Sequence, residues 1–215
     1  MGFGLGGVRE DMDSHPAAVS ETEEASARRP ASPRDRLIEA ATTLFCRYGV
    51  NSVGVDAIVE AAGTAKTTLY KLFGSKDGLV EAVLEREGRL WRDWFIAEID
   101  GPGGSAAERL ARIGPTLRKW FSRADYYGCP FINAVGESDK ADDRMRTLAL
   151  AHKKIVLARL GELSADAGCR DAREIAHTLG LIIDGAIVAA LVTRDAAVAD
   201  TAGRACATIL SGGRA

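Results

Sequence analysis

The chain has 215 residues, enough to bury a substantial core in one or two domains. Its 28 lysines and arginines against 30 acids give a formal net charge of −2, which excludes a generally basic, histone-like nucleic-acid binder. Any contact with DNA must therefore come from a local basic patch. We expect no apolar run long enough to cross a membrane and find no signal-like segment at the start, so we predict a cytoplasmic protein without a membrane partner.

The four cysteines and three histidines are scattered along the chain, with no CxxC pair. This pattern predicts free thiols, no disulfide framework, no metal site and no cofactor. A redox switch at Cys46 or Cys129 is the minor alternative.

Residues 1–31 are rich in Gly, Ser, Ala and Pro and carry six acids against three arginines. With only scattered hydrophobic residues, this segment cannot bury enough surface to offset the entropy lost on ordering. We predict a disordered tail.

Order is expected to begin at "SPRDRLIEAATTLFCRYG". Ser32 can cap a first helix, Pro33 suits its first position, and Asp35 would complete an S-x-x-D capping box. Gly49 ends the helix. The inner face is predicted from apolar residues at helical spacing, namely Leu37, Ala40, Ala41, Leu44, Phe45 and Tyr48.

Two short helices and one long helix are expected next. The apolar stripe of the second helix consists of Val55, Ile58, Val59 and Ala62. A third helix, roughly Lys66 to Phe73, turns Leu69 and Phe73 inward, and Ser75 can cap a fourth that begins at Lys76.

The rest of the chain also has the apolar periodicity of helices. The expected segments are about 76–98, 106–122 with a kink at Pro115, 131–136, 140–163, 171–193 and 195–210. No alternating strand pattern occurs, so we predict an all-α fold of about nine helices.

The stretch "GTAKTTLYKLFGSKDGL" contains three lysines, three threonines and a tyrosine. Two short helices joined at a glycine describe a helix-turn-helix. An α-helix fits the major groove of DNA, where its leading residues reach base edges and phosphates. Lys76, at the start of the next helix, lies where free backbone N–H groups also favour an anion.

The segments "LIEAATTLFCRYGV", "DAIVEAAG" and "KTTLYKLFGSKDGLVEAVL" resemble the TetR family of bacterial transcriptional regulators, over about Arg34 to Leu84. The resemblance implies an N-terminal three-helix DNA-binding domain over 32–84. It also implies a larger helical domain over 85–215 that binds a small-molecule effector and forms the homodimer. The DNA-binding roles fall on Lys66, Thr67, Thr68, Tyr70, Lys71 and Lys76, with Thr64 as the expected cap of the third helix.

Three positions depart from the family pattern. Gly54 stands where the second helix often begins with Thr or Ser, so a hydroxyl contact to phosphate is lost there. Ala65 replaces a frequent Ser, and Leu72 replaces a frequent His or Tyr.

Aromatic residues are concentrated after the helix-turn-helix, and ligand cavities are mostly apolar with a few polar groups. The segment "YYGCPFINAVGE" resembles one that lies beside the effector cavity in part of the family. The candidate effector-binding residues are Trp94, Phe121, Tyr127, Phe131, Asn133, His177 and Asp184. The alternative for each aromatic residue is a place in the core.

The segment "HTLGLIIDGAIVAALVT" is the most apolar of the predicted helices. Its small residues, and those of the last helix at 202–206, offer surfaces for close packing. Two such helices from each subunit would form a four-helix dimer interface. Asp184 within the apolar run needs a partner if it is buried.

We therefore predict a homodimeric repressor that binds a near-palindromic operator with reading helices about 34–36 Å apart and is released by an effector. A DNA-binding activator or an effector-independent binder is the first alternative. An all-α enzyme is the distant one, since no HExxH motif, phosphate-binding glycine loop or catalytic triad occurs. Arg28, Arg29 and Arg34 could reach a minor groove, but a solvated linker is favoured.

Overall fold

The computed structural model describes residues 31–139, 141 and 143–213. The expected disordered tail, with Arg28 and Arg29, therefore lies outside the described residues apart from Ala31. Within the described ranges the chain forms ten α-helices and no β-strand, which confirms the all-α fold.

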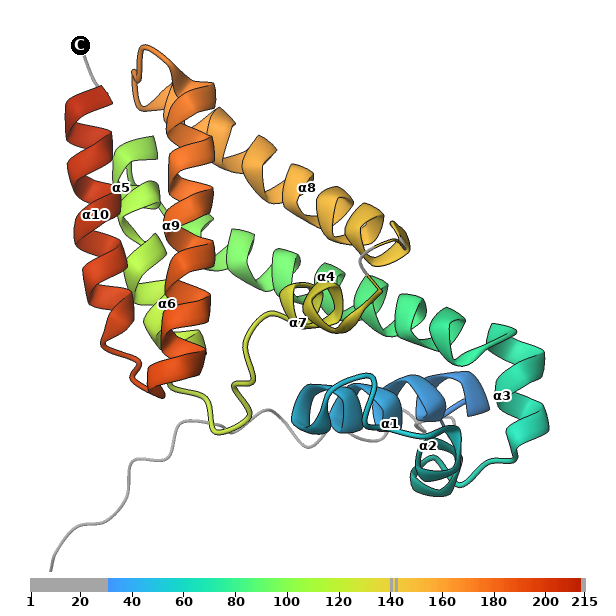
Figure 1. Ribbon diagram of the computed structural model, residues 1–215. Helices are drawn as coiled ribbons and strands as arrows, with labels where there is room; N and C mark the ends of the chain where they lie inside the picture. Colours follow the sequence, from blue (N-terminus) through green and yellow to red (C-terminus); the bar gives the residue numbers. More distant parts are fainter. Residues whose placement is uncertain (1–30, 140, 142, 214–215) are drawn as a thin grey trace, which may run out of the picture. The chain divides into compact units, whose positions relative to one another are not determined.

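The helices follow one another from blue to red in Figure 1. Their bounds are α1 Pro33–Tyr48, α2 Val55–Ala61, α3 Lys66–Phe73, α4 Lys76–Asp100, α5 Ala106–Ala111, α6 Ile113–Phe121, α7 Pro130–Glu137, α8 Arg144–Asp166, α9 Ala172–Thr193 and α10 Val198–Gly213. Because α4 runs without a break past Leu84, the predicted domain boundary between 84 and 85 falls inside a helix and stays a prediction.

The N-terminal caps predicted at Ser32 and Ser75 are present. The Ser32 hydroxyl accepts the Asp35 backbone N–H at 3.2 Å, and the Ser75 hydroxyl accepts that of Gly78 at 3.0 Å. The Asp35 carboxylate accepts the Ser32 hydroxyl instead of closing the expected capping box. A complete box, which the sequence analysis missed, is formed by Ser105 and Glu108 at the start of α5.

The helix expected over 106–122 is two helices separated at Arg112, so the kink predicted at Pro115 lies one turn too late. Proline has no N–H to donate to the carbonyl four residues earlier, and its ring crowds that carbonyl. The chain therefore breaks before Pro115, which then lies in the first turn of α6, where the missing N–H costs little. This break accounts for ten helices where about nine were expected.

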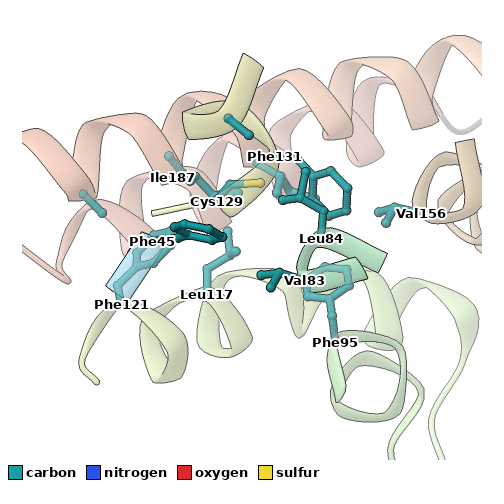
Figure 2. Close-up of a cluster of buried hydrophobic side chains, with 14 of the residues drawn as sticks. Phe45, Val83, Leu84, Phe95, Leu117, Phe121, Cys129, Phe131, Val156 and Ile187 are labelled. Carbon is teal, nitrogen blue, oxygen red and sulfur yellow. The ribbon is translucent and has the colours of Figure 1, made fainter. Parts of the chain in front are cut away.

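A single hydrophobic core joins the N-terminal helices to the others. Figure 2 shows side chains of α1, α4, α6, α7, α8 and α9 meeting in it. Leu37, Ala41 and Phe45 are buried as predicted, but Tyr48 is 53% exposed, because the helix ends there and turns it away from the core. Leu69 is fully buried and fixes α3 to the core.

Helix α9 corrects the expectation about apolar runs. Among the described residues, it alone is long and apolar enough to cross a membrane. The core helix of a soluble protein passes the same test, and α9 buries Leu179, Ile183 and Ile187. Its composition is therefore no argument for a membrane protein.

Candidate functional site

Helix α3 presents a polar face to solvent. The turn between α2 and α3 includes Gly63, whose φ of +58° suits glycine, and α3 is held by the fully buried Leu69. The exposed fraction of Tyr70 is 49%, and Thr68 is half-buried. The remaining exposed residues of this face are Lys66, Thr67, Lys71 and Leu72.

An ion pair lies beside this face. Lys66 Nζ is 2.6 Å from Asp56 Oδ1, and both side chains are exposed. The hydrogen bond that Lys66 donates to Asp56, and then the charge of that carboxylate, raise the pKa of Lys66. The sequence showed three lysines and no acid between residues 64 and 76, but Asp56, ten positions before Lys66, supplies the opposite charge in space. The negative charge of Asp56 therefore weakens the attraction of Lys66 for a DNA phosphate.

Removing this acid should strengthen binding to DNA. In Asp56→Asn the Lys66 ammonium is free to contact phosphate, and we expect the affinity to rise about threefold, with a steeper dependence on salt. Glu60→Gln is the matched control, since it removes the same charge from α2 at a residue with no ion pair in the described part of the chain. Fluorescence anisotropy on a labelled duplex measures both. Equal gains in the two variants would show that Asp56 does not act through Lys66.

Lys76 has a structural contact that the sequence did not reveal. Its Nζ donates to the Val50 carbonyl at 2.6 Å and so ties α4 to the turn after α1. An ammonium has three donors, so two remain for a phosphate. The Ser75 hydroxyl already accepts one N–H of the α4 N-terminus. The DNA contact of Lys76 stays a prediction.

One expectation at the start of α3 is wrong. Thr64 does not cap the helix, because the N-cap residue is Ala65 and the Thr64 hydroxyl is buried without a hydrogen-bond partner among the described residues. The exposed Arg34 guanidinium lies over the Phe73 ring at 5.5 Å, and its contact with a minor groove stays the less favoured alternative to a solvated linker. Gly54 begins α2 without a side-chain cap, as its lack of a hydroxyl requires.

The effector candidates do not converge on one pocket. His177 and Asp184 line a cavity of about 220 Å³ among α4, α8 and α9, here called the α8–α9 cavity. Trp94 and Tyr127 line a separate cavity of about 470 Å³ between α1, α4 and the segment after α6, here called the α1–α4 cavity. Phe131 lines a space of about 20 Å³ that shares Trp91 with both.

Two candidates line none of these three cavities. Phe121 packs in the core, and Asn133 donates through Nδ2 to the Tyr127 carbonyl at 2.9 Å, which fixes the segment before α7. The alternative stated for each aromatic candidate, a place in the core, is therefore correct for Phe121. The partner that Asp184 required is Lys153 of α8, with which it forms an ion pair.

His152 is a site residue that the sequence analysis missed. It is 5% exposed, its Nδ1 accepts from Arg92 Nη1 at 2.9 Å, and its ring stacks on Phe131 with centroids 4.3 Å apart. Burial, then the charges of Arg92 and Lys153, lower the pKa of His152 to about 3. The sequence signal that could have revealed a buried His152 was its place in the apolar stripe of α8, one turn before the buried Val156.

The buried neutral imidazole should make the protein sensitive to mild acid. Because the pKa of His152 is about 3 in the folded chain and near 6.5 when unfolded, the unfolded state binds the extra proton between these values, and stability falls as the pH falls. We expect a loss of about 2 kcal/mol between pH 6.5 and pH 5.

His152→Gln keeps an acceptor for Arg92 and should reduce the fall in the free energy of unfolding between pH 6.5 and pH 5. His177→Gln, at an exposed histidine, should leave that fall unchanged. Denaturant unfolding at several pH values measures the slope. The same slope in wild type and His152→Gln would assign the acid sensitivity to other groups.

The cysteines match the prediction, since all four are free. Burial, then the charges of Glu87 and Asp125, raise the pKa of the Cys46 thiol to about 11. Burial also raises the pKa of Cys129. A thiol with a raised pKa forms little of the reactive thiolate, which argues against the redox alternative at both residues.

Comparison with known proteins agrees with this geometry. Residues 37–83 match the family described as "Bacterial regulatory proteins, tetR family". The uncharacterized HTH-type transcriptional regulator Rv1255c of Mycobacterium tuberculosis is 35% identical over 106 residues, covering 45% of this chain and 52% of that protein. The HTH-type transcriptional repressor KstR2 of Mycolicibacterium smegmatis is 39% identical over 114 residues, covering 53% and 54%. These matches span about half the length of the curated relatives.

The solved structures extend the likeness beyond the helix-turn-helix. SCO4454, a TetR-family transcriptional regulator from Streptomyces coelicolor, superposes with a TM-score of 0.78 at 28% sequence identity, covering 85% of this chain and 96% of that one. Relatives and neighbours alike are transcriptional regulators, which sets the enzyme alternative aside. The order of helices, the exposed polar face of α3 and these matches together show that residues 37–83 form the DNA-binding region typical of the TetR family, and that most of the chain has the fold of a TetR-family transcriptional regulator.

Proposed function

We propose that the protein is a cytoplasmic transcriptional repressor that binds a near-palindromic operator as a homodimer and is released by a small-molecule effector. The observation that carries the DNA-binding step is the outward face of α3, where Thr67, Tyr70 and Lys71 stand on a helix held by the buried Leu69. Such a helix can enter the major groove with its polar face toward bases and phosphates. The repressor KstR2 among the relatives supports the direction of regulation.

Selection from a pool of random duplexes tests this proposal. The protein should enrich an inverted repeat, and footprinting should protect two half-sites about one turn of DNA, roughly 34–36 Å, apart or a multiple of it. Enrichment of a single unrepeated site would contradict the dimeric mode of binding. No enrichment at any salt concentration would contradict DNA binding itself.

Helix α7 is the element we propose to couple an effector to the DNA-binding helices. Its first residues, Pro130 and Phe131, line the small space beside His152. At its other end the Glu137 carboxylate accepts the Asn51 N–H at 3.0 Å, and Asn51 Nδ2 donates to the Glu137 carbonyl at 2.9 Å. A shift of α7 would therefore move the turn between α1 and α2. An effector changes the DNA affinity only by as much as it binds more tightly to the protein with α7 in one of its two positions, shifted or unshifted.

The dimer interface we propose is centred on α9. Leu181, Val188 and Val192 lie on one side of this helix with exposed fractions of 73%, 44% and 76%. Some of the small residues predicted to serve the interface are buried within the subunit. Ala186 and Ala190 are buried, and Gly203 of α10 packs against Gly114 of α6.

Charging this face should separate the subunits. In Leu181→Asp with Val192→Asp, each dimer would bury four carboxylates at an apolar interface, so we expect a monomer by light scattering and loss of operator binding. Leu150→Asp on α8 is the control, since Leu150 is also exposed, at 59%, but lies on another helix. A dimer that persists in the double variant would place the interface elsewhere.

A further inference from the structure

The α1–α4 cavity has the composition of a binding site in its own right. Its volume of about 470 Å³ lies in the range of small-molecule sites. It is bounded by α1, by α4, by Trp120 of α6 and by the segment 123–130. Trp91, Trp94 and Trp120, which are all the tryptophans of the chain, line it together.

The aromatic wall is packed in place. Trp91 stacks on Phe95 with centroids 4.7 Å apart and meets Trp120 at 5.2 Å. Trp120 in turn contacts Tyr126 edge-on at 5.3 Å. Because these rings support one another, the aromatic wall keeps its place when a ligand enters the cavity. The face of an indole ring carries partial negative charge and attracts a cation within about 6 Å.

Two charges in this cavity form no ion pair among the described residues, Glu87 and Arg47. The half-buried Glu87 carboxylate accepts a long hydrogen bond from Thr42 at 3.4 Å and forms no ion pair among the described residues. Arg123 is engaged by Asp125 through two hydrogen bonds of 2.8 Å. Arg47 is exposed, with its guanidinium over the Tyr48 ring at 5.1 Å. The lining thus holds two acids and two arginines, and Glu87 is its half-buried charge without an ion pair. After the larger effect of the Asp125 hydrogen bond, the charge of Glu87 also raises the pKa of Arg123.

We propose that the α1–α4 cavity binds an organic cation, with its ammonium group beside Glu87 and its apolar body against the tryptophans. A carboxylate and indole faces together recognise a quaternary ammonium, because the carboxylate supplies the charge and the rings replace water around the methyl groups. This site is distinct from the α8–α9 cavity, whose carboxylate, Asp184, is already paired with Lys153.

The position of this cavity gives the cation a regulatory consequence, which rests on the proposed function. Thr42, Cys46 and Arg47 of α1 line one side, and Glu87, Trp91 and Trp94 of α4 line another. A bound cation would touch the helix that packs behind the reading helix and would fix its distance from α4.

The binding itself is tested without DNA. The intrinsic tryptophan fluorescence and calorimetry of the full chain are titrated with three probes of similar shape: benzyltrimethylammonium, benzyl alcohol and phenylacetate. We expect benzyltrimethylammonium to bind at least tenfold more tightly than either of the others. Glu87→Gln should weaken the cation about tenfold. Glu85→Gln, which removes the same charge from an exposed position of α4, should not.

Asp184→Asn shows which of the two cavities binds the cation, and it should leave cation binding unchanged. Melting temperatures show that every variant is folded. Equal binding of the three probes, preference for phenylacetate, or an unchanged affinity in Glu87→Gln would overturn the proposal. Loss of cation binding in Asp184→Asn would also overturn it by assigning the cation to the α8–α9 cavity. Any of these results leaves the proposed operator binding intact, since that is measured separately.

Discussion

Tyr70→Ala combined with Lys71→Ala should weaken operator binding at least a hundredfold, about 3 kcal/mol. Both side chains are exposed on α3, and neither has an ion pair in the described part of the chain. A dimer would lose both residues twice, so four contacts disappear at once. Loss of two lysines per dimer should also reduce the slope of log affinity against log salt by about two. Fluorescence anisotropy over a range of salt concentrations measures both effects.

The control for this variant is Lys154→Ala, which removes the same positive charge from an exposed position on α8. It should change affinity by less than about threefold, since charges far from the duplex are screened. The folding of both variants is checked by thermal unfolding, where no difference is expected because the residues are exposed. An equal loss of affinity in both would mean that net charge, and not the α3 face, governs binding.

Gly114→Val should have the largest effect on stability, about 3 kcal/mol or more. A Cβ at Gly114 would lie 2.9 Å from the Gly203 Cα and 3.3 Å from the Ala199 carbonyl oxygen. These are backbone atoms of α10, so no side chain can turn aside, and α6 and α10 must separate. The surrounding core includes Leu117 and Cys206, which would lose contacts as the helices part.

Gly212→Val is the matched control, because Gly212 is also helical but a Cβ there would meet nothing within 4 Å. We expect a change within about 1 kcal/mol, since valine and glycine differ little in helix propensity. Denaturant unfolding at one fixed protein concentration measures both variants, because subunit association also contributes to stability. Similar stability of the two variants would show that the α6–α10 approach can relax.

Much of the fold could be predicted because it depends on local signals. The period of apolar residues, the caps at Ser32 and Ser75 and the glycine at 49 each act within a few positions, and the structure has helices begin or end at these places. Pro115 was recognised as a disturbance, but its effect was placed at the proline and not one turn before it. That position depends on which carbonyl the missing N–H would have bonded.

The features of the site that the sequence did not predict depend on pairs of residues from different elements. Nothing in the spacing of Lys66 and Asp56, or of Lys76 and Val50, shows that they meet, because helical periodicity fixes a face and not the neighbour opposite it. The effector candidates were assigned to one pocket for the same reason. His152 was different, since its position on the buried stripe of α8 could have been read from the sequence.

The central claim is that the exposed face of α3 binds duplex DNA through its phosphates and base edges. The most direct test is the affinity of the wild-type protein for its selected operator as salt is raised from about 50 to 200 mM. We predict a linear fall of log affinity with log salt, steeper than about −3, since phosphate contacts release counterions in proportion to their number. An affinity that does not change over this range would contradict the account.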